Sequence, residues 1–325
     1  MAPDIATPAG SATPSRRADL IDLARGLALV AMFVFHFTWD LSLFRLVATD
    51  IAAEPGWRWF ARCIAASFLV IVGFSLVLAT RNGFKARPYF KRLAMVAGAA
   101  GLVTLGTWFA LPDAYIFFGI LHHIAVASVL GLAFLQLPLL AVAGGAITAF
   151  ALPPLVTSPV LDASWLSWLG LGRQPLSTAD YVPVLPWFGW VLTGIVLARL
   201  VLASPFGTRI MDWRATSAPT RLLAWGGRHS LAVYLIHQPV FFAVLFPVAR
   251  IAAMPAADAR PFIAACERSC AASGQTAATC RPACLCTVDR LKRAQLWDRV
   301  LTDRLSADER ARMSEIAEGC YDELR

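Results

Sequence analysis

Charged residues are scarce in this sequence. Asp, Glu, Lys and Arg make up only 15% of the 325 residues, whereas 58% are hydrophobic and the mean hydropathy is +0.61. Soluble globular domains carry about 25% charged residues, so this composition excludes an ordinary soluble domain. No soluble basic face accompanies the net charge of +8, and a nucleic-acid-binding function is therefore not expected. The composition indicates an integral membrane protein.

Apolar segments long enough to cross a bilayer recur along the first 255 residues. A transmembrane helix needs about 20 predominantly apolar residues. The fourth and fifth segments are the least clearly separated, because only Gln136, Leu137 and Pro138 lie between them. The sequence predicts an all-α polytopic membrane protein with about seven transmembrane helices, at residues 22–47, 60–80, 93–111, 116–135, 138–156, 186–204 and 230–253.

Acidic residues are absent from the connection between the second and third segments, which contains five basic ones. Arginines also surround the end of the sixth segment, while the alternate connections are acidic or neutral. Under the positive-inside rule the basic connections are cytoplasmic. We therefore expect a bacterial inner-membrane protein with a cytoplasmic N-terminus and, after seven crossings, a periplasmic C-terminus. Residues 1–17, rich in Ala, Pro and Thr, are predicted to be a disordered cytoplasmic lead to a membrane domain at residues 18–255.

Cysteine is nearly absent from that membrane domain, whereas six of the seven cysteines lie in a polar tail at residues 256–325. Two pairs are spaced by three residues, which puts both thiols of a pair one turn apart on a helix. We predict a helical hairpin with periplasmic disulfides Cys266–Cys284, Cys270–Cys280 and Cys286–Cys320, although six cysteines allow 15 pairings. A zinc or iron–sulfur site is the alternative. The tail lacks both a CxxC pair and a histidine, so we expect no metal.

The first apolar segment contains ionisable residues at helical spacing. Arg25 and His36 are eleven positions apart, so they share a helix face and lie about 16 Å apart along the axis. Asp22 precedes Arg25 by one turn, and Asp40 follows His36 by one turn, where it could orient the imidazole. An ionisable residue inside a membrane is a functional hypothesis by default. The spacing predicts a polar stripe that runs from one membrane face to the other.

Several motifs carry a family resemblance over roughly residues 17–245. They are Asp22-x2-Arg25-Gly26 followed by His36, Phe118-Gly119-Ile120-Leu121-His122, Asp180-Tyr181-Val182-Pro183, Pro186-Trp187-Phe188-Gly189, Gly227-Arg228-His229-Ser230-Leu231, and Tyr234-Leu235-Ile236-His237-Gln238-Pro239. With these motifs the chain resembles the bacterial relatives of heparan-alpha-glucosaminide N-acetyltransferase, the DUF1624 group of membrane acyltransferases. The lysosomal enzyme carries a catalytic histidine in a loop soon after this first helix, and this chain has no histidine between His36 and His122.

The resemblance implies an acyltransferase that moves an acyl group, most simply acetyl, from cytoplasmic acyl-CoA to a sugar or glycan at the periplasmic face. A histidine is well matched to taking a proton from the acceptor. We expect catalytic residues at His36, Asp40 and His122, an acyl-CoA contact at Asp22, Arg25 and Arg228, and substrate-lining residues at Asp180, Tyr234 and His237.

Two other functions remain open from the sequence. The same buried groups could relay protons in a proton-coupled transporter or permease, although no internal repeat is visible. Alternatively, the protein could be a non-catalytic partner whose disulfide-linked tail binds another envelope protein. The acceptor, the acyl chain length and the oligomeric state cannot be predicted from the sequence.

Overall fold

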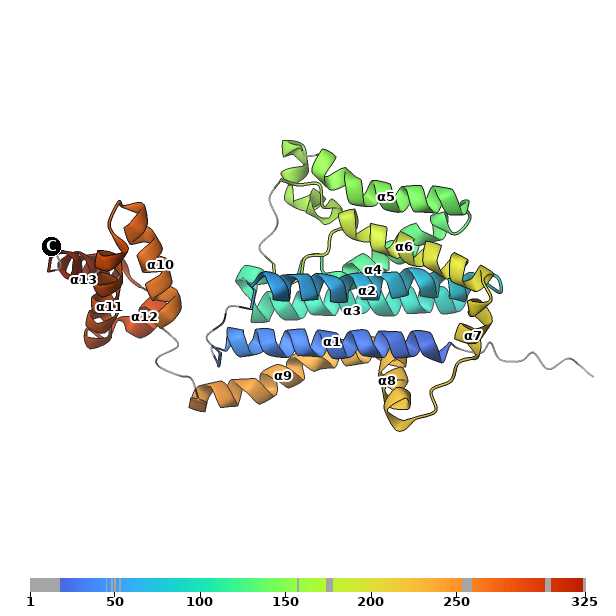
Figure 1. The fold of residues 1–325 in the computed structure, drawn as a ribbon, viewed down its shortest axis with the longest axis horizontal. Helices are drawn as coiled ribbons and strands as arrows, with labels where there is room; N and C mark the ends of the chain where they lie inside the picture. The colour runs from blue at the N-terminus through green and yellow to red at the C-terminus, as the bar shows by residue number, and fades with distance from the viewer. Residues whose placement is uncertain are drawn as a thin grey trace, which may run out of the picture. The chain divides into compact units, whose positions relative to one another are not determined.

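The protein is almost entirely helical. The computed structural model describes residues 18–323 except residues 45, 48, 50, 53, 157, 174–177, 253–258 and 302–304. The residues so described form 13 α-helices and three short 3-10 helices, without a strand, which confirms the predicted all-α fold (Figure 1). The predicted disordered lead, residues 1–17, lies outside the described part. Two compact units are distinguished, one of residues 1–36 and 55–240 and the other of residues 37–54 and 241–325.

Seven apolar helices occupy the places of the seven predicted spans. Two of them are short: α4 has 15 residues and α5 has 17, which at about 1.5 Å per residue gives less than the roughly 30 Å of a bilayer core. Each of the other five of these seven helices is long and apolar enough to cross a membrane. The seven are α1 (Asp19–Leu43), α2 (Pro55–Thr80), α3 (Ala86–Ala110), α4 (Ile120–Phe134), α5 (Leu139–Leu155), α6 (Val184–Ala203) and α9 (Ser230–Ala252).

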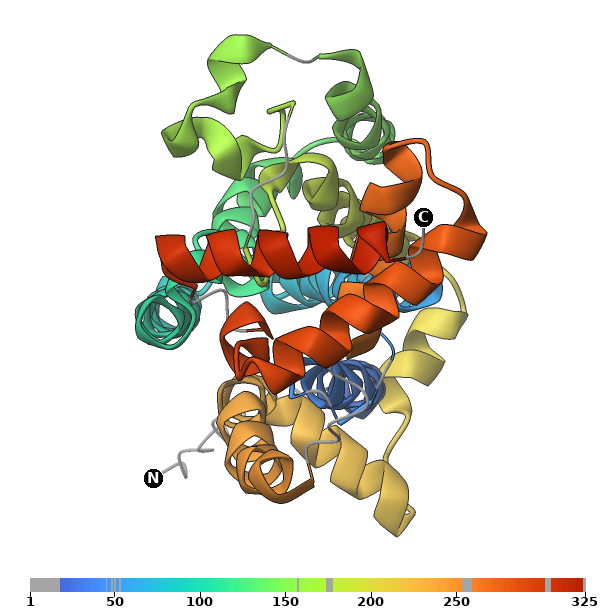
Figure 2. The same cartoon turned by 90° about the vertical axis from the view of Figure 1, so that its left-hand side faces the viewer.

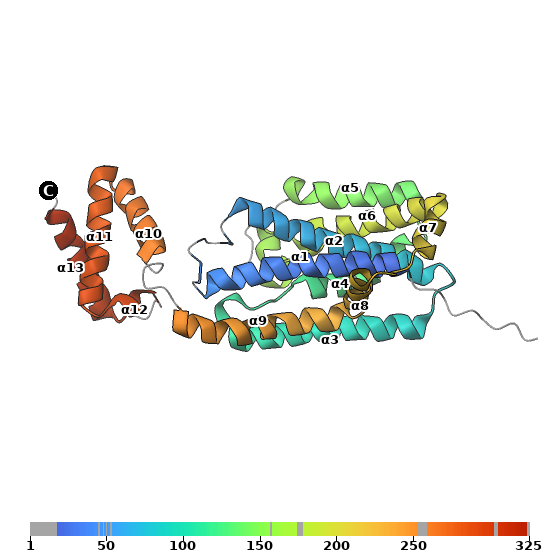
Figure 3. The same ribbon diagram turned by 60° about the horizontal axis from the view of Figure 1, so that its bottom comes forward.

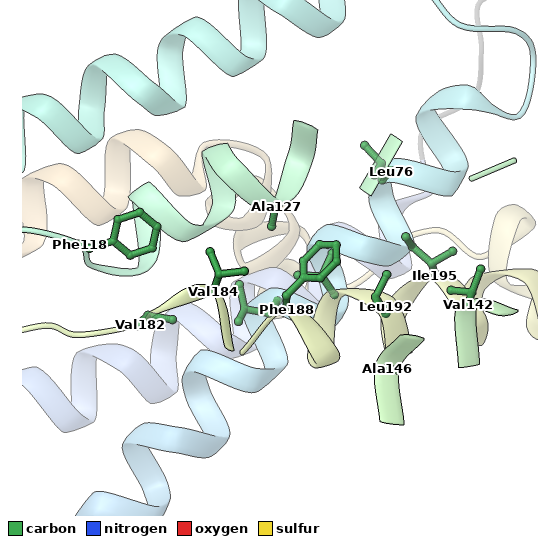
Figure 4. Close-up of a cluster of buried hydrophobic side chains, with 12 residues drawn as sticks. Leu76, Phe118, Ala127, Val142, Ala146, Val182, Val184, Phe188, Leu192 and Ile195 are labelled. Carbon is green, nitrogen blue, oxygen red and sulfur yellow. The ribbon is translucent and has the colours of Figure 1, made fainter. Parts of the chain in front are cut away.

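Helix α6 is the centre of the first unit and packs against both α2 and α5. Its backbone touches that of α2, because a Cβ at Gly194 would lie 2.1 Å from the Val70 carbonyl oxygen and one at Gly73 would lie 2.0 Å from that of Val191. Small residues allow this close approach of helices in membranes. The side chains around the contact form the main apolar core, where Leu192 and Ile195 of α6 are almost completely buried (Figure 4).

The turn between α4 and α5 is held by one side chain. Arg199 of α6 donates hydrogen bonds to the carbonyl oxygens of Phe134, Leu135 and Leu137, at 3.0, 2.6 and 2.6 Å. These carbonyls have no partner within α4, since the last turn of a helix leaves its acceptors open. Arg199 therefore fixes the end of α4 to the central helix.

The segment between α5 and α6 is ordered by local contacts. It contains the 3-10 helices Pro159–Asp162 and Ser164–Leu169, and Asp162 pairs with Arg173 through two hydrogen bonds, at 2.7 and 2.9 Å. Further along, the Tyr181 hydroxyl donates to the Ser167 carbonyl at 2.7 Å. The Val182 N–H donates to the Phe118 carbonyl, which joins this segment to the start of α4.

Two short helices, α7 (Phe206–Asp212) and α8 (Ala218–Arg228), follow α6. Figures 1 and 3 show that α8 runs across the direction of α1 rather than along it. The crossing is close, because a Cβ at Gly26 would lie 2.1 Å from the Leu223 carbonyl oxygen and one at Gly227 would lie 1.8 Å from that of Asp22. Only glycine fits at these two positions with the backbones as they are.

The cysteine-rich tail forms four helices. Three disulfides join Cys266 to Cys284, Cys270 to Cys280 and Cys286 to Cys320, which confirms the three predicted pairs. The first two bridges link α10 to α11 and the third links α11 to α13, which crosses α11 in Figure 2. A small core around Leu291 and Trp297 supplements the bridges. The helices are α10 (Ala259–Ala272), α11 (Ala277–Arg293), α12 (Trp297–Leu301) and α13 (Ala307–Asp322).

Candidate functional site

The first cluster of polar side chains lies near the start of α1. The Arg25 guanidinium donates to the Asp22 carboxylate at 2.9 Å, to the Ser75 hydroxyl of α2 at 2.9 Å and to the Gly227 carbonyl of α8 at 3.3 Å. Both charged side chains are largely buried, with 14% and 12% of their surface exposed. Asp22 and Arg25 are thus paired with each other, and Arg25 joins three helices.

Other cations lie around this cluster. Arg228, at the end of α8, is 3.7 Å from the carboxylate of Asp19 and is partly exposed. Arg92 of α3 interacts electrostatically with both Asp22 and Arg25. The Arg25 guanidinium is committed to protein partners, whereas Arg228 and Arg92 present charge to the exterior. An anion arriving here would therefore meet those two arginines first.

The predicted continuous polar stripe on α1 is wrong. Leu29 and Met32 lie between Arg25 and His36 on the same helix face, and each is only 3% exposed. They pack with Ile64 of α2 in an apolar cluster. The helix therefore carries two separate polar clusters. Between them lies the apolar cluster of Leu29, Met32 and Ile64, here called the hydrophobic plug. Helical spacing placed the ionisable groups on one face, but it does not make the intervening residues polar.

The second cluster contains two histidines. The imidazole centroids of His36 on α1 and His237 on α9 are 5.0 Å apart. Phe33 stacks on His237 at 5.5 Å, and Tyr234 meets it at 5.5 Å as well. His237 Nδ1 lies 2.5 Å from the Tyr234 carbonyl oxygen, which can only accept a hydrogen bond. Nδ1 therefore carries the proton, and in the neutral ring Nε2 carries the lone pair.

Asp180 belongs to the segment before α6, and its side chain lies beside the first residue of α4. Its carboxylate accepts a hydrogen bond from the Ile120 N–H at 2.8 Å, and a Cβ at Gly119 would lie 2.3 Å from the same oxygen. Burial raises the pKa of Asp180 to about 6, against the effect of the Ile120 hydrogen bond. Asp180 also interacts electrostatically with Tyr234. The carboxylate thus caps α4 and acts on the aromatic side chain beside His237.

The two adjacent histidines of α4 have different surroundings. His122 Nδ1 accepts from the Gly119 N–H at 3.3 Å and its Nε2 lies 3.1 Å from the Thr104 hydroxyl, so both ring nitrogens have protein partners. His123 is completely buried, and its Nδ1 lies 3.2 Å from the carbonyls of Val182 and Pro183. Both side chains therefore fasten the start of α4 to neighbouring segments. No pattern in the sequence indicates this role for His123.

Asp40, the remaining predicted residue, is completely buried in α1. It belongs to the second compact unit, whereas the other predicted site residues belong to the first. Ser75 and the two glycines of the α1–α8 crossing were not predicted. Only a Gly residue beside each charged one, as in Arg25-Gly26 and Gly227-Arg228, marks that crossing in the sequence.

Among the described residues, no three or more His, Cys, Asp or Glu side chains lie close enough together to hold a metal ion. The six tail cysteines are bridged, so their sulfurs are not available as thiolate ligands. The first polar cluster offers arginines and the second a pair of imidazoles.

A family model described as heparan-alpha-glucosaminide N-acetyltransferase, catalytic, matches residues 17–239, which is more than half of the chain. The match includes both polar clusters and ends before the cysteine-rich tail. Neither a curated protein nor a solved structure matches the chain.

Proposed function

Since this chain belongs to the heparan-alpha-glucosaminide N-acetyltransferase family, we propose that it transfers an acyl group, most simply acetyl, from cytoplasmic acyl-CoA to a sugar or glycan at the periplasmic face. The family makes it an acetyltransferase-type membrane enzyme. The observation that best supports acyl transfer to a sugar or glycan is the pair of imidazoles, His36 and His237, inside the matched region.

The donor end of the proposed site is the cationic cluster. Acyl-CoA carries phosphates, and arginine recognises phosphate through its planar fork of N–H donors. Arg228 and Arg92 are the exposed arginines of this end. Asp22 and Arg25 hold α1, α2 and α8 together and so shape the surface that the nucleotide would contact.

The acceptor end is the imidazole cluster. A hydroxyl or amine attacks a thioester only as its proton is removed, and an imidazole is suited to that task near neutral pH. We assign this role to His36, with Asp40, four residues further along α1, as an orienting group. Tyr234 and His237 line the site, and Asp180 positions the start of α4 beside it. His122 maintains the same region by its bonds to Gly119 and Thr104.

The sidedness of the proposal follows from the helix count. Five or seven crossings are both odd, so the two ends of the membrane region face opposite sides whether or not the short pair α4 and α5 spans the bilayer. The basic connections favour a cytoplasmic N-terminus. The disulfides of the tail fit an oxidising compartment, as the bacterial periplasm is.

The test uses purified protein in liposomes with acyl-labelled acetyl-CoA. We expect label to be released or transferred to an added amino sugar or oligosaccharide, and His36→Ala to lower this rate at least about 100-fold. His229→Ala is the matched control, because this exposed histidine lies against the backbone and ring of Trp225 in its own helix region. Label that stays on CoA in every preparation would contradict the proposal and favour a proton-coupled transporter, which would instead acidify or alkalinise the vesicle.

A further inference from the structure

A groove lies at the end of α6, apart from both polar clusters. It has a volume of about 500 Å³ and is formed by the start of α1, the last turn of α6 and the α7 region. Figures 1 and 3 show α7 at the end of α6, beside the first turns of α1. The volume is within the range of ligand sites, about 300–1,000 Å³. The lining residues all belong to the first compact unit and include Leu20, Ser204, Phe206, Arg209, Ile210 and Trp213.

The lining is almost entirely apolar. The Ser204 hydroxyl donates to a carbonyl of α6 at 2.7 Å, so its hydrogen is already used within the protein. A nucleotide base in this groove would lose hydrogen bonds to water that the lining does not replace, whereas a hydrocarbon chain loses none. The surface therefore favours a hydrocarbon chain. It comes from two aliphatic and two aromatic side chains, Leu20, Ile210, Phe206 and Trp213.

One cation faces this apolar surface. The guanidinium carbon of Arg209 lies 5.8 Å from the centre of the Phe206 ring, and the side chain is exposed. Within the described part of the chain, no carboxylate or carbonyl pairs with the Arg209 guanidinium. The guanidinium of Arg214, by contrast, donates to the carbonyls of Met211 and Trp213, at 2.9 and 2.8 Å. Arg209 thus keeps a planar fork of N–H donors, which fits a phosphate, available beside the groove.

The groove lies at the level where the lipid phosphates of a membrane lie. Helix α6 is long and apolar enough to cross a membrane, and it ends at Ala203, just before α7 begins at Phe206. The end of a spanning helix marks the interface between hydrocarbon and head groups, where tryptophan is enriched. A phospholipid of that leaflet can reach the groove from the side. Basic pockets between membrane helices bind anionic head groups in this way.

We propose that the groove binds one anionic phospholipid of the surrounding leaflet, with its phosphate at Arg209 and part of an acyl chain against Phe206 and Trp213. A zwitterionic head group brings a second cation close to the guanidinium, so the anionic lipid is preferred. The bound lipid contacts both α7 and the start of α1, because both line the groove. The site is separate from the proposed acyl transfer and does not depend on it.

The test is native mass spectrometry of the full chain, delipidated in a neutral detergent. Dioleoyl phosphatidylglycerol and dioleoyl phosphatidylcholine have the same acyl chains and differ in the charge of the head group. We expect a single lipid adduct and an affinity about fivefold higher for phosphatidylglycerol, because one basic residue near a membrane surface contributes about that factor. Arg209→Gln should abolish this preference and leave the melting temperature of the lipid-free protein unchanged. Arg221→Gln, which removes an exposed arginine of α8 outside the groove, should keep the wild-type preference.

A second variant tests the hydrocarbon part of the site. Phe206 is 61% exposed, so Phe206→Ala removes apolar surface from the groove without opening the protein core. It should weaken both lipids by about fivefold, whatever their head group, since the lost contact is with the acyl chain. Leu222→Ala is the control, because this side chain of α8 is 69% exposed and does not line the groove.

Several outcomes would overturn the inference. Equal affinities for the two lipids, or a preference that survives Arg209→Gln, would mean adsorption to the general apolar surface. Displacement of the lipid by glycerol 3-phosphate would show a site for free phosphate, and displacement by acetyl-CoA would assign the groove to the nucleotide. A protein dimer that excludes the lipid would assign it to a second copy of the chain. A protein that binds the lipid but shows no acyl transfer contradicts the proposed function alone.

Discussion

The crossing of α1 and α8 gives the sharpest structural prediction. A Cβ at Gly227 would lie 1.8 Å from the Asp22 carbonyl oxygen and 3.0 Å from the Gly26 nitrogen, and both are backbone atoms that cannot rotate away. The helices must therefore separate in Gly227→Ala. Overpacking of this kind costs about 1–3 kcal/mol, and the weakened bond from the charged Arg25 to the Gly227 carbonyl adds about 1.5–3 kcal/mol. We expect a total loss of about 2.5–6 kcal/mol in the free energy of unfolding.

The neighbouring residue provides the control. A Cβ at Gly226 would have no atom within 4 Å, so Gly226→Ala makes the same chemical change in the same helix without a clash. It should be neutral or stabilising by up to about 1 kcal/mol, because alanine has the better helix propensity. Both variants are compared with wild type by thermal unfolding in detergent, followed by tryptophan fluorescence. Equal melting temperatures for the two variants would show that the α1–α8 contact is not as close as described.

Three further predictions concern other parts of the molecule. Asp180 has a pKa of about 6 when folded and near 3.8 when unfolded, so the folded state binds more protons between about pH 4 and pH 6, and the free energy of unfolding falls as the pH rises through that range. Asparagine at this position keeps the hydrogen bond to the Ile120 N–H but does not titrate. The melting temperature of Asp180→Asn relative to that of wild type should therefore rise from pH 4 to pH 6. Arg199→Ala removes three hydrogen bonds to carbonyl oxygens, although the Phe134 carbonyl still accepts from the Leu137 N–H. It should lower the free energy of unfolding, measured from the urea midpoint, by about 3 kcal/mol, whereas Arg209→Ala should not. The Cys286–Cys320 disulfide closes a loop of 34 residues, so Cys286→Ser should destabilise the tail by about 4 kcal/mol. The Cys270–Cys280 disulfide closes a loop of 10 residues, so Cys270→Ser should destabilise it by about 3 kcal/mol. Protease resistance of the tail in urea measures both changes.

The features that the sequence predicted well are those governed by local pattern. Long apolar segments can satisfy their backbone in lipid only as helices, and each predicted segment contains one. The Cys-x3-Cys spacing puts two sulfurs on one helix face. In an antiparallel hairpin, the two cysteines far from the turn then face each other, and so do the two cysteines close to it. The pairs Cys266–Cys284 and Cys270–Cys280 follow from that geometry.

The features that the sequence did not reveal depend on contacts between distant segments. The plug at Leu29 and Met32 is apolar in the sequence, but only packing against Ile64 shows that it separates the polar clusters. Asp180 and Ile120 are 60 residues apart, so the cap on α4 has no local signature. The hydrogen bond of His237 is made to a backbone carbonyl, an acceptor that every residue carries, so it has no signature in the sequence. Nor does the sequence show that His36 lies beside His237.

The hydrophobic plug changes how transfer across the bilayer has to be understood. A continuous stripe of ionisable groups filled with water would let protons move between the two membrane faces and would admit water to the thioester, whose hydrolysis competes with transfer. Leu29, Met32 and Ile64 form an apolar cluster on the face between Arg25 and His36, which are about 16 Å apart along the helix. Under the proposed function, the acyl-bearing arm of the donor must part these side chains to reach the imidazoles. Under the same proposal, the resting protein would pass no protons along this face, and the binding of the nucleotide at the arginines would supply the free energy that separates the side chains.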